Sequence, residues 1–212
     1  MTKLINTAPP RLPTAPDAYD KRFHDLHSDV LRLYFNQTSS LLGAVVGQNG
    51  GQYVECPNGL FFDLGNYSPA APNTGYPLKF QQTYLGNAIH VVDSTKITVD
   101  IGGVYNFQYS SAITSTNASL KTVWVWIVRN GVPVGYSTNA YTLSGSGSVT
   151  IISWQFNIDL GVGEYVEMYW GASDTNVTIS TTVPTAPHPG IPANVIAVNF
   201  ISPLPDPRPT PP

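Results

Sequence analysis

The chain has 212 residues, of which 42% are hydrophobic and only 11% are Asp, Glu, Lys or Arg. This is enough apolar material for one medium domain with appendages, and the single cysteine excludes a disulfide framework within the chain. The formal charge is −3, and because no basic residues cluster, nucleic acid is not an expected partner.

Both ends of the chain are rich in proline. Residues 1–16 contain four prolines and no periodic apolar face, which predicts an extended arm that becomes ordered only against a partner. The N-terminus lacks the apolar region of a signal peptide, and no stretch approaches the roughly 20 apolar residues of a membrane span. We therefore expect synthesis in a cytosol and no membrane insertion.

An amphipathic helix is predicted from Asp17 to Gln37. Asp17 serves as the N-cap, and Asp20 three positions later completes a pattern like a capping box. One apolar seam follows at steps of four and three residues: Tyr19, Phe23, Leu26, Val30 and Leu33, widened by Leu31, Tyr34 and Phe35. This seam needs a cover, which is either the chain's own sandwich, a neighbouring protein or a three-helix bundle, because two heptads do not establish a coiled coil.

Residues 41–76 read as a linker with short strands. The turn-forming Pro57-Asn58-Gly59 separates predicted strands at Gln52 to Cys56 and Leu60 to Leu64, and a loop with three prolines occupies residues 66–77.

From Pro77 to Ile201 the pattern changes to repeated short strands. The alternation and turn signals predict strands at Leu78 to Leu85, Ala88 to Val92, Ile97 to Asp100, Val104 to Ser110, Thr122 to Arg129, Val132 to Tyr136, Val149 to Leu160, Glu164 to Ala172, Asn176 to Thr182 and Asn194 to Ile201. This cadence is typical of an all-β antiparallel sandwich or jelly roll.

One strand is apolar on both faces. In Val123 to Val128, one side carries Val123, Val125 and Ile127, and the other carries Trp124, Trp126 and Val128, so the strand needs a second cover. An oligomer interface is the simplest cover, and we predict a trimer interface made of Val123, Trp124, Val125, Trp126, Tyr165 and Tyr169. Alternatively, the helix or the loop carrying Tyr67 and Tyr76 lies over the tryptophans.

No catalytic or metal-binding pattern emerges, so we expect neither an enzyme nor a cofactor. The four histidines are scattered, and the spacing of His24 and His27 suits solvated surface residues better than metal ligands. Gly47 to Gly51 lacks the Lys and Ser/Thr of a phosphate-binding loop.

Three stretches resemble the C1q and tumour-necrosis-factor-like jelly rolls: IGGVYNFQYS (Ile101 to Ser110), VWVWIVRNGVPV (Val123 to Val134) and LGVGEYVEMYW (Leu160 to Trp170). They follow the family's order of Gly-X-Tyr-X-Phe, a strand with Asn-Gly, and Leu-X-X-Gly-Asp/Glu-X-Val, with Glu164 in place of the usual Asp. The resemblance implies a homotrimer packed about a threefold axis.

A second resemblance is to virion structural proteins of tailed bacteriophages, particularly marine ones. It is carried by LPTAPDAYDKRF (Leu12 to Phe23) and LRLYFNQ (Leu31 to Gln37), which precede a jelly roll in such proteins. It implies that Leu12, Pro13, Tyr19, Phe23, Leu26, Val30, Leu33 and Tyr34 anchor the chain on other virion proteins, of the capsid or the tail.

The hypothesis is therefore a non-enzymatic, homotrimeric virion protein assembled in the host cytoplasm. Its parts are an anchoring arm and helix (1–40), a linker (41–76), a jelly roll (77–201) and a tail (202–212). It serves as a capsid decoration protein or as a fibre component. The alternative is a lectin-like module that binds a host surface glycan through polar loops such as Ser110 to Ser119 and Ser137 to Ser148.

Overall fold

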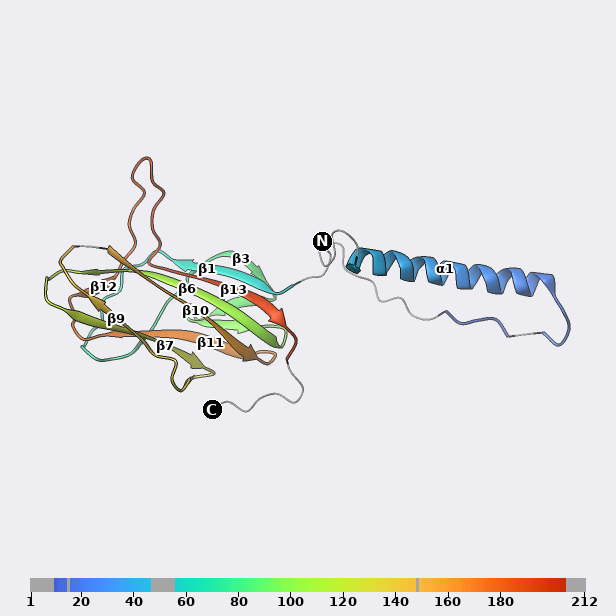
Figure 1. Ribbon diagram of the computed structural model, residues 1–212, viewed down its shortest axis with the longest axis horizontal. Coiled ribbons are helices and arrows are strands. Elements are labelled where there is room, and N and C mark those ends of the chain that lie inside the picture. The colour runs from blue at the N-terminus through green and yellow to red at the C-terminus, as the bar shows by residue number, and fades with distance from the viewer. Residues whose placement is uncertain (1–9, 15, 47–55, 148, 205–212) are drawn as a thin grey trace. The chain divides into compact units, whose positions relative to one another are not determined.

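The computed structural model describes residues 10–14, 16–46, 56–147 and 149–204 (Figure 1). It divides into two compact units, Met1–Glu55 and Cys56–Pro212. The elements within the described ranges are α1 (Lys21–Val46), β1 (Asn58–Asp63), β2 (Tyr76–Pro77), β3 (Gln82–Asn87), β4 (Ile89–Val92), β5 (Lys96–Val99), β6 (Gly103–Ser115), β7 (Lys121–Arg129), β8 (Val132–Pro133), β9 (Asn139–Leu143), β10 (Val149–Leu160), β11 (Tyr165–Ala172), β12 (Val177–Ile179) and β13 (Asn194–Ser202).

The helix α1 of the first unit starts later and ends later than its sequence pattern predicted. Asp20, not Asp17, is the N-cap, because the Asp20 carboxylate accepts a hydrogen bond from the backbone N–H of Arg22 at 2.9 Å. The helix continues past Gln37 to Val46, since residues 38–46 contain no proline and Leu41 and Leu42 prolong the apolar side. The predicted division at residue 40 therefore falls inside α1.

The second unit is an antiparallel jelly-roll sandwich, which confirms the predicted fold class. Sheet A has the strand order β10-β6-β13-β1-β3, with β12 also paired to β6. Sheet B has the order β4-β5-β11-β7-β8, with β2 paired to β11 and β9 paired to β7. The two sheets lie face to face in Figure 1, and a hairpin between β12 and β13 projects beyond them.

The sandwich was predicted to start at Pro77, but it begins earlier in the chain. Strand β1 pairs along its whole length with β13 and with β3, so the predicted linker strand Leu60 to Leu64 is in fact part of sheet A. Its alternate residues, Phe61 and Asp63, are buried, which the two-residue period requires of a strand with one face on a core. The other predicted linker strand, Gln52 to Cys56, lies outside the described residues except for Cys56.

The core fills the space between the sheets. Sheet A contributes Phe107, whose ring stacks on that of Phe156 with centroids 5.0 Å apart, and sheet B contributes Met168 and Ile97. Phe107, Met168 and Ile97 are completely shielded from solvent. The apolar area that such residues remove from water supplies the main favourable free energy of folding.

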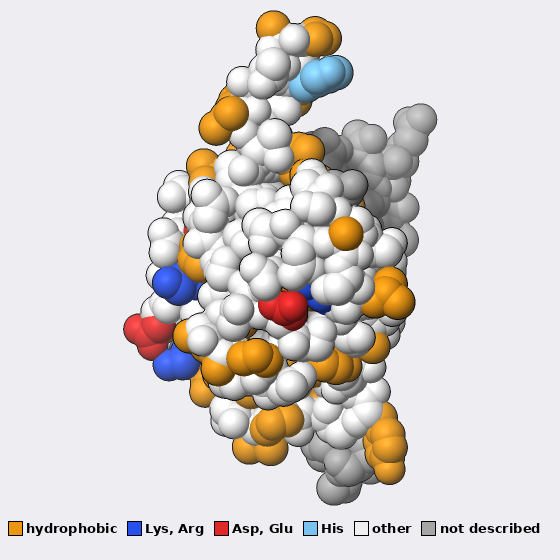
Figure 2. All heavy atoms as spheres, turned by 90° about the vertical axis from the view of Figure 1, so that its left-hand side faces the viewer, with side chains coloured by type: hydrophobic (Ala, Val, Ile, Leu, Met, Phe, Trp, Pro, Cys, Tyr) orange, Lys and Arg blue, Asp and Glu red, His pale blue; other side chains and the backbone are white. Residues whose placement is uncertain are grey.

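One end of the sandwich encloses a lysine. The side chain of Lys121, at the start of β7, is 2% exposed, and its ammonium group donates hydrogen bonds to the Ser119 carbonyl (2.9 Å), the Ser119 hydroxyl (3.0 Å) and both oxygens of Asn117. A buried ammonium group is tolerated when its donors are satisfied in this way. Figure 2 faces this side of the molecule and shows few charged side chains among mostly neutral ones.

Candidate functional site

The structure separates the six residues of the predicted trimer interface into two groups. Val123 and Val125 point inward and are 0% and 1% exposed, so they belong to the core of the chain itself and are not available to a partner. That part of the prediction is wrong, because the strand has its own second sheet on that side. Trp124, Trp126 and Tyr169 are half-buried on the outer face of sheet B, together with Tyr165.

A loop covers part of this aromatic face. A side chain at Gly75 would come within 2.6 Å of the Trp126 ring, so the absence of one lets the loop lie against the indole. The Trp126 and Tyr169 rings also contact each other, with centroids 5.9 Å apart. The alternative prediction, that a loop lies over the tryptophans, therefore holds for Trp126. Tyr76 of that loop, however, turns inward beside Trp170. Burial, assisted by the carboxylate of Glu167, raises the pKa of the Tyr169 hydroxyl above its ordinary value.

Trp124 instead lies at a hollow of about 480 Å³, which we call the indole pocket. In the sheet its direct neighbours are Gly171 on one side and Ala140 on the other, and neither has a side chain that could cover an indole ring. Trp126 also contributes to the lining, and the exposed residues Asn73, Thr74 and Thr138 bring polar groups to it. The pocket thus combines two aromatic rings with neutral hydrogen-bonding groups, and its lining residues include no charged side chain.

The remaining wall of the indole pocket is a turn after β8. The backbone N–H of Ser137 bonds the Val134 carbonyl at 3.4 Å, and the buried Ser137 hydroxyl donates to the same carbonyl at 2.8 Å. Tyr136, at the third position of this turn, has a φ of 59° and a fully exposed side chain. Glycine or asparagine normally occupies this left-handed position, so tyrosine is held there at a cost in free energy. The sequence pattern predicted Tyr136 in a strand, Val132 to Tyr136, but β8 ends at Pro133 and Tyr136 belongs to the turn.

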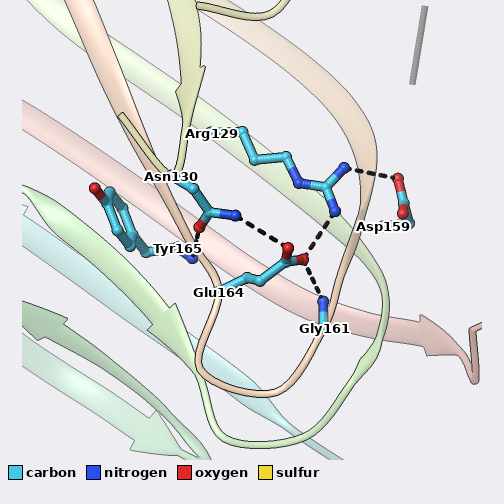
Figure 3. A network of polar contacts seen from close by, with 6 residues as sticks. All are labelled: Arg129, Asn130, Asp159, Gly161, Glu164 and Tyr165. Atoms are coloured by element: carbon cyan, nitrogen blue, oxygen red, sulfur yellow. Dashed lines mark hydrogen bonds and ion pairs between the residues drawn. The ribbon is translucent and has the colours of Figure 1, made fainter. Parts of the chain in front are cut away.

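A polar network closes the other end of the sandwich (Figure 3). Arg129 of β7 bonds Asp159 of β10 at 3.4 Å and Glu164 at 2.8 Å, so it joins sheet B to sheet A. Glu164 also accepts hydrogen bonds from the Gly161 backbone and from Asn130. Each carboxylate is thus engaged by cations or amides at the joint between strands, an arrangement suited to holding the fold.

The outer face of sheet A has a different chemistry. The pairing registers direct amide side chains outward from its centre, namely Asn106, Gln108, Gln155, Asn157 and Asn199. Apolar residues surround them, including Leu60, Phe62, Leu85, Val195 and Ala197. Along β1, β3, β6, β10 and β13, the only outward charged residue is Asp159, which is paired with Arg129 at one end.

The predicted anchoring residues lie on the first unit. Leu26, Leu33 and Tyr19 are 56%, 60% and 81% exposed, and Leu12 is 49% exposed. Pro13, Phe23, Val30 and Tyr34 are half-buried. The histidines His24 and His27 contact the ring of Phe23, and no group of three metal-ligating side chains gathers in the described part of the chain. No described helix is both long and apolar enough to cross a membrane.

Solved structures to which the chain is similar share little sequence identity with it. The chain is similar to the globular domain of zebrafish complement 1qA protein, with 15% identity over 69% of this chain and 98% of that one, at a TM-score of 0.45. It is also similar to the Eiger TNF from S. frugiperda, with 11% identity over 74% of this chain and 99% of that one, at a TM-score of 0.47. Neither a family model nor a curated protein matches the chain. At these low identities, the two similar structures give no information on a phage particle or on a ligand.

Proposed function

We propose that the chain is a non-enzymatic, homotrimeric structural protein of a bacteriophage particle. In this proposal the arm and α1 attach to the particle, and the jelly roll forms an exposed head. The phage assignment is supported by the resemblance of Leu12 to Phe23 and Leu31 to Gln37 to virion proteins. The observation that carries self-association is the outer face of sheet A.

That face has the composition of a contact between proteins. Charged residues are depleted at the cores of protein interfaces, because an ion that leaves water must find a partner. The centre of sheet A exposes amides, which can exchange hydrogen bonds across a contact, and Leu60 and Ala197, which lose apolar area there. Several of the amides already bond one another, as Asn106 does with Asn157 at 2.8 Å, so they are ordered before association.

The outer face of sheet B is a weaker candidate for the trimer contact. Its half around β4 and β5 carries charged or ionisable groups, including His90, Lys96 and Glu167, that bond residues of the same chain. Its other half is hollowed by the indole pocket. Trp124 and Trp126 therefore remain as a competing contact to be tested.

Attachment is supported by the helix. Alpha-helical periodicity places Leu26 and Leu33 on one apolar arc with the half-buried Phe23 and Tyr34, and places Arg32 on the charged side. Within the first unit this apolar arc is exposed, which suits a protein partner, and the arm before it has a composition that becomes ordered on binding.

The trimer is tested by measuring the mass of the full chain in solution. We expect three times the chain mass of 22.9 kDa. Ala197→Asp, which puts a charge on the outer face of sheet A, should give monomers, whereas the matched variant Ala140→Asp on sheet B should stay trimeric. A monomeric wild type overturns the trimer, and dissociation by Ala140→Asp alone transfers the contact to the tryptophan face.

Attachment is tested on particles. Labelled antibody should detect the protein on purified virions, and its position on the head or the tail separates decoration from a fibre role. Leu33→Asp should abolish incorporation without changing the mass in solution, while Arg32→Asp, on the charged side of the same turn, should not. Incorporation of Leu33→Asp at the wild-type level would exclude α1 as the anchor.

A further inference from the structure

We propose that the indole pocket binds a neutral saccharide unit of a glycan. This goes beyond the structural role above, since it concerns the outer face of sheet B in each copy and does not depend on the trimer.

Size and shape favour a small ligand over a flat protein contact. The volume of about 480 Å³ falls within the range of small-molecule sites. Gly171 and Ala140, the sheet neighbours of Trp124, leave the indole uncovered by their own side chains. The loop at Thr74 and the Trp126 ring lie over Gly171, so the side open to another flat, partly apolar ring is the one next to the exposed Ala140.

The chemistry of the lining selects the class of ligand. An indole face contacts the C–H side of a pyranose ring, while hydroxyl groups around the sugar need both donors and acceptors. Asn73 supplies an amide, and Thr74 and Thr138 supply hydroxyls, which donate and accept. No lining residue carries a charge that would pair with a phosphate, sulfate or carboxylate, so a neutral sugar fits best.

The turn beside the pocket supplies a second, independent observation. Tyr136 follows the lining residue Val134 by two positions, holds a positive φ that disfavours a side chain, and exposes its whole ring. Strained backbone of this kind persists where a residue serves binding. We infer that the Tyr136 ring stacks on a second sugar next to the one in the pocket.

The test uses the full chain with neutral hexose and N-acetylhexosamine oligosaccharides and with their sialylated or uronate-containing counterparts. We expect binding of at least one neutral oligosaccharide with a Kd of about 1 mM per site. Because no ion pair is involved, raising the salt concentration should leave the Kd unchanged. Acidic sugars should not bind more tightly than the neutral ones.

Two variants locate the site. Trp124→Ala should weaken binding by about 10-fold or more, as expected for a buried aromatic anchor. Tyr136→Gly, which relieves the backbone and is expected to fold at least as well as the wild type, should weaken binding of oligosaccharides about 3- to 10-fold. Tyr84→Ala is the matched control, since Tyr84 is 78% exposed on sheet A.

Four results would overturn the proposal. The first is that no neutral saccharide binds at about 10 mM, and the second is that Trp124→Ala and Tyr136→Gly bind as the wild type does. The third is an affinity that falls steeply as the salt concentration rises. The fourth is a change in the oligomer mass of Trp124→Ala. The last result would make the pocket a contact between copies.

Discussion

The two outer faces of the sandwich are built from strands of the same kind, yet they differ in relief and in charge. Sheet A directs amides and apolar residues outward along long, regularly paired strands, as β6 and β10 do over twelve residue pairs. Sheet B directs large aromatic rings outward, but the loop at Gly75 and the turn at Tyr136 interrupt its surface. A regular neutral face suits another protein surface, whereas an aromatic hollow suits a small ligand.

The outer faces of the two sheets show how one core can support two different surfaces. In each strand every second side chain is committed to the core, so the remaining residues are free to vary. On β7, replacing Trp124 would leave Val123 and Val125 in place, and on β6, replacing Gln108 would leave Phe107 in place.

The largest loss of stability is expected from a substitution in the core that the two sheets share. Phe107→Ala should lower the free energy of unfolding by about 3–5 kcal/mol, because it removes a fully buried ring and leaves a cavity beside Phe156. Denaturant unfolding measures it, with Tyr84→Ala as a surface control that should stay within about 0.5 kcal/mol. A small loss for Phe107→Ala would mean that neighbouring side chains move in to fill the space that the ring leaves.

A smaller loss of stability is expected at the polar network that joins the two sheets. Arg129→Ala should cost about 1–3 kcal/mol, since it leaves the partly buried carboxylates of Asp159 and Glu164 without the guanidinium. Arg129→Lys should recover part of the loss, because it restores the charge without the forked geometry. Equal unfolding midpoints for Arg129→Ala and the wild type would show that backbone pairing alone holds this end.

The smallest expected effect is a gain in stability. Tyr136→Gly should raise the free energy of unfolding by about 1 kcal/mol, since glycine adopts a φ of 59° without steric cost. Thermal unfolding measures the shift, and Tyr136→Asn should give an intermediate value. A destabilised Tyr136→Gly would mean that the ring makes contacts within the fold.

The sequence was sufficient to predict the sandwich but not its limits. Strands with clear alternation, such as Val149 to Leu160, were predicted with the bounds that the structure has. Strand β9 was missed because Asn139 to Leu143 is only five residues long and lies between serine-rich segments that resemble a polar loop. β1 was assigned to a linker because pairing with β13, far along the chain, leaves no local signal.

The candidate sites were predicted only in part. The two-sided pattern of Val123 to Val128 located the tryptophans correctly on one face, but it could not tell which face another sheet would cover. The indole pocket depends on Gly171 and Ala140 standing beside Trp124, and on a turn from a third segment. Such register relations between distant strands are not encoded in local spacing.

The enclosed ammonium group of Lys121 makes this lysine a built-in reporter. Reagents that acylate amines need an accessible nitrogen, which Lys121 does not offer while the oxygens of Asn117 and the carbonyl and hydroxyl of Ser119 hold it. Its acylation would therefore record how often this end of the sandwich opens, at a point on β7 only three residues from Trp124.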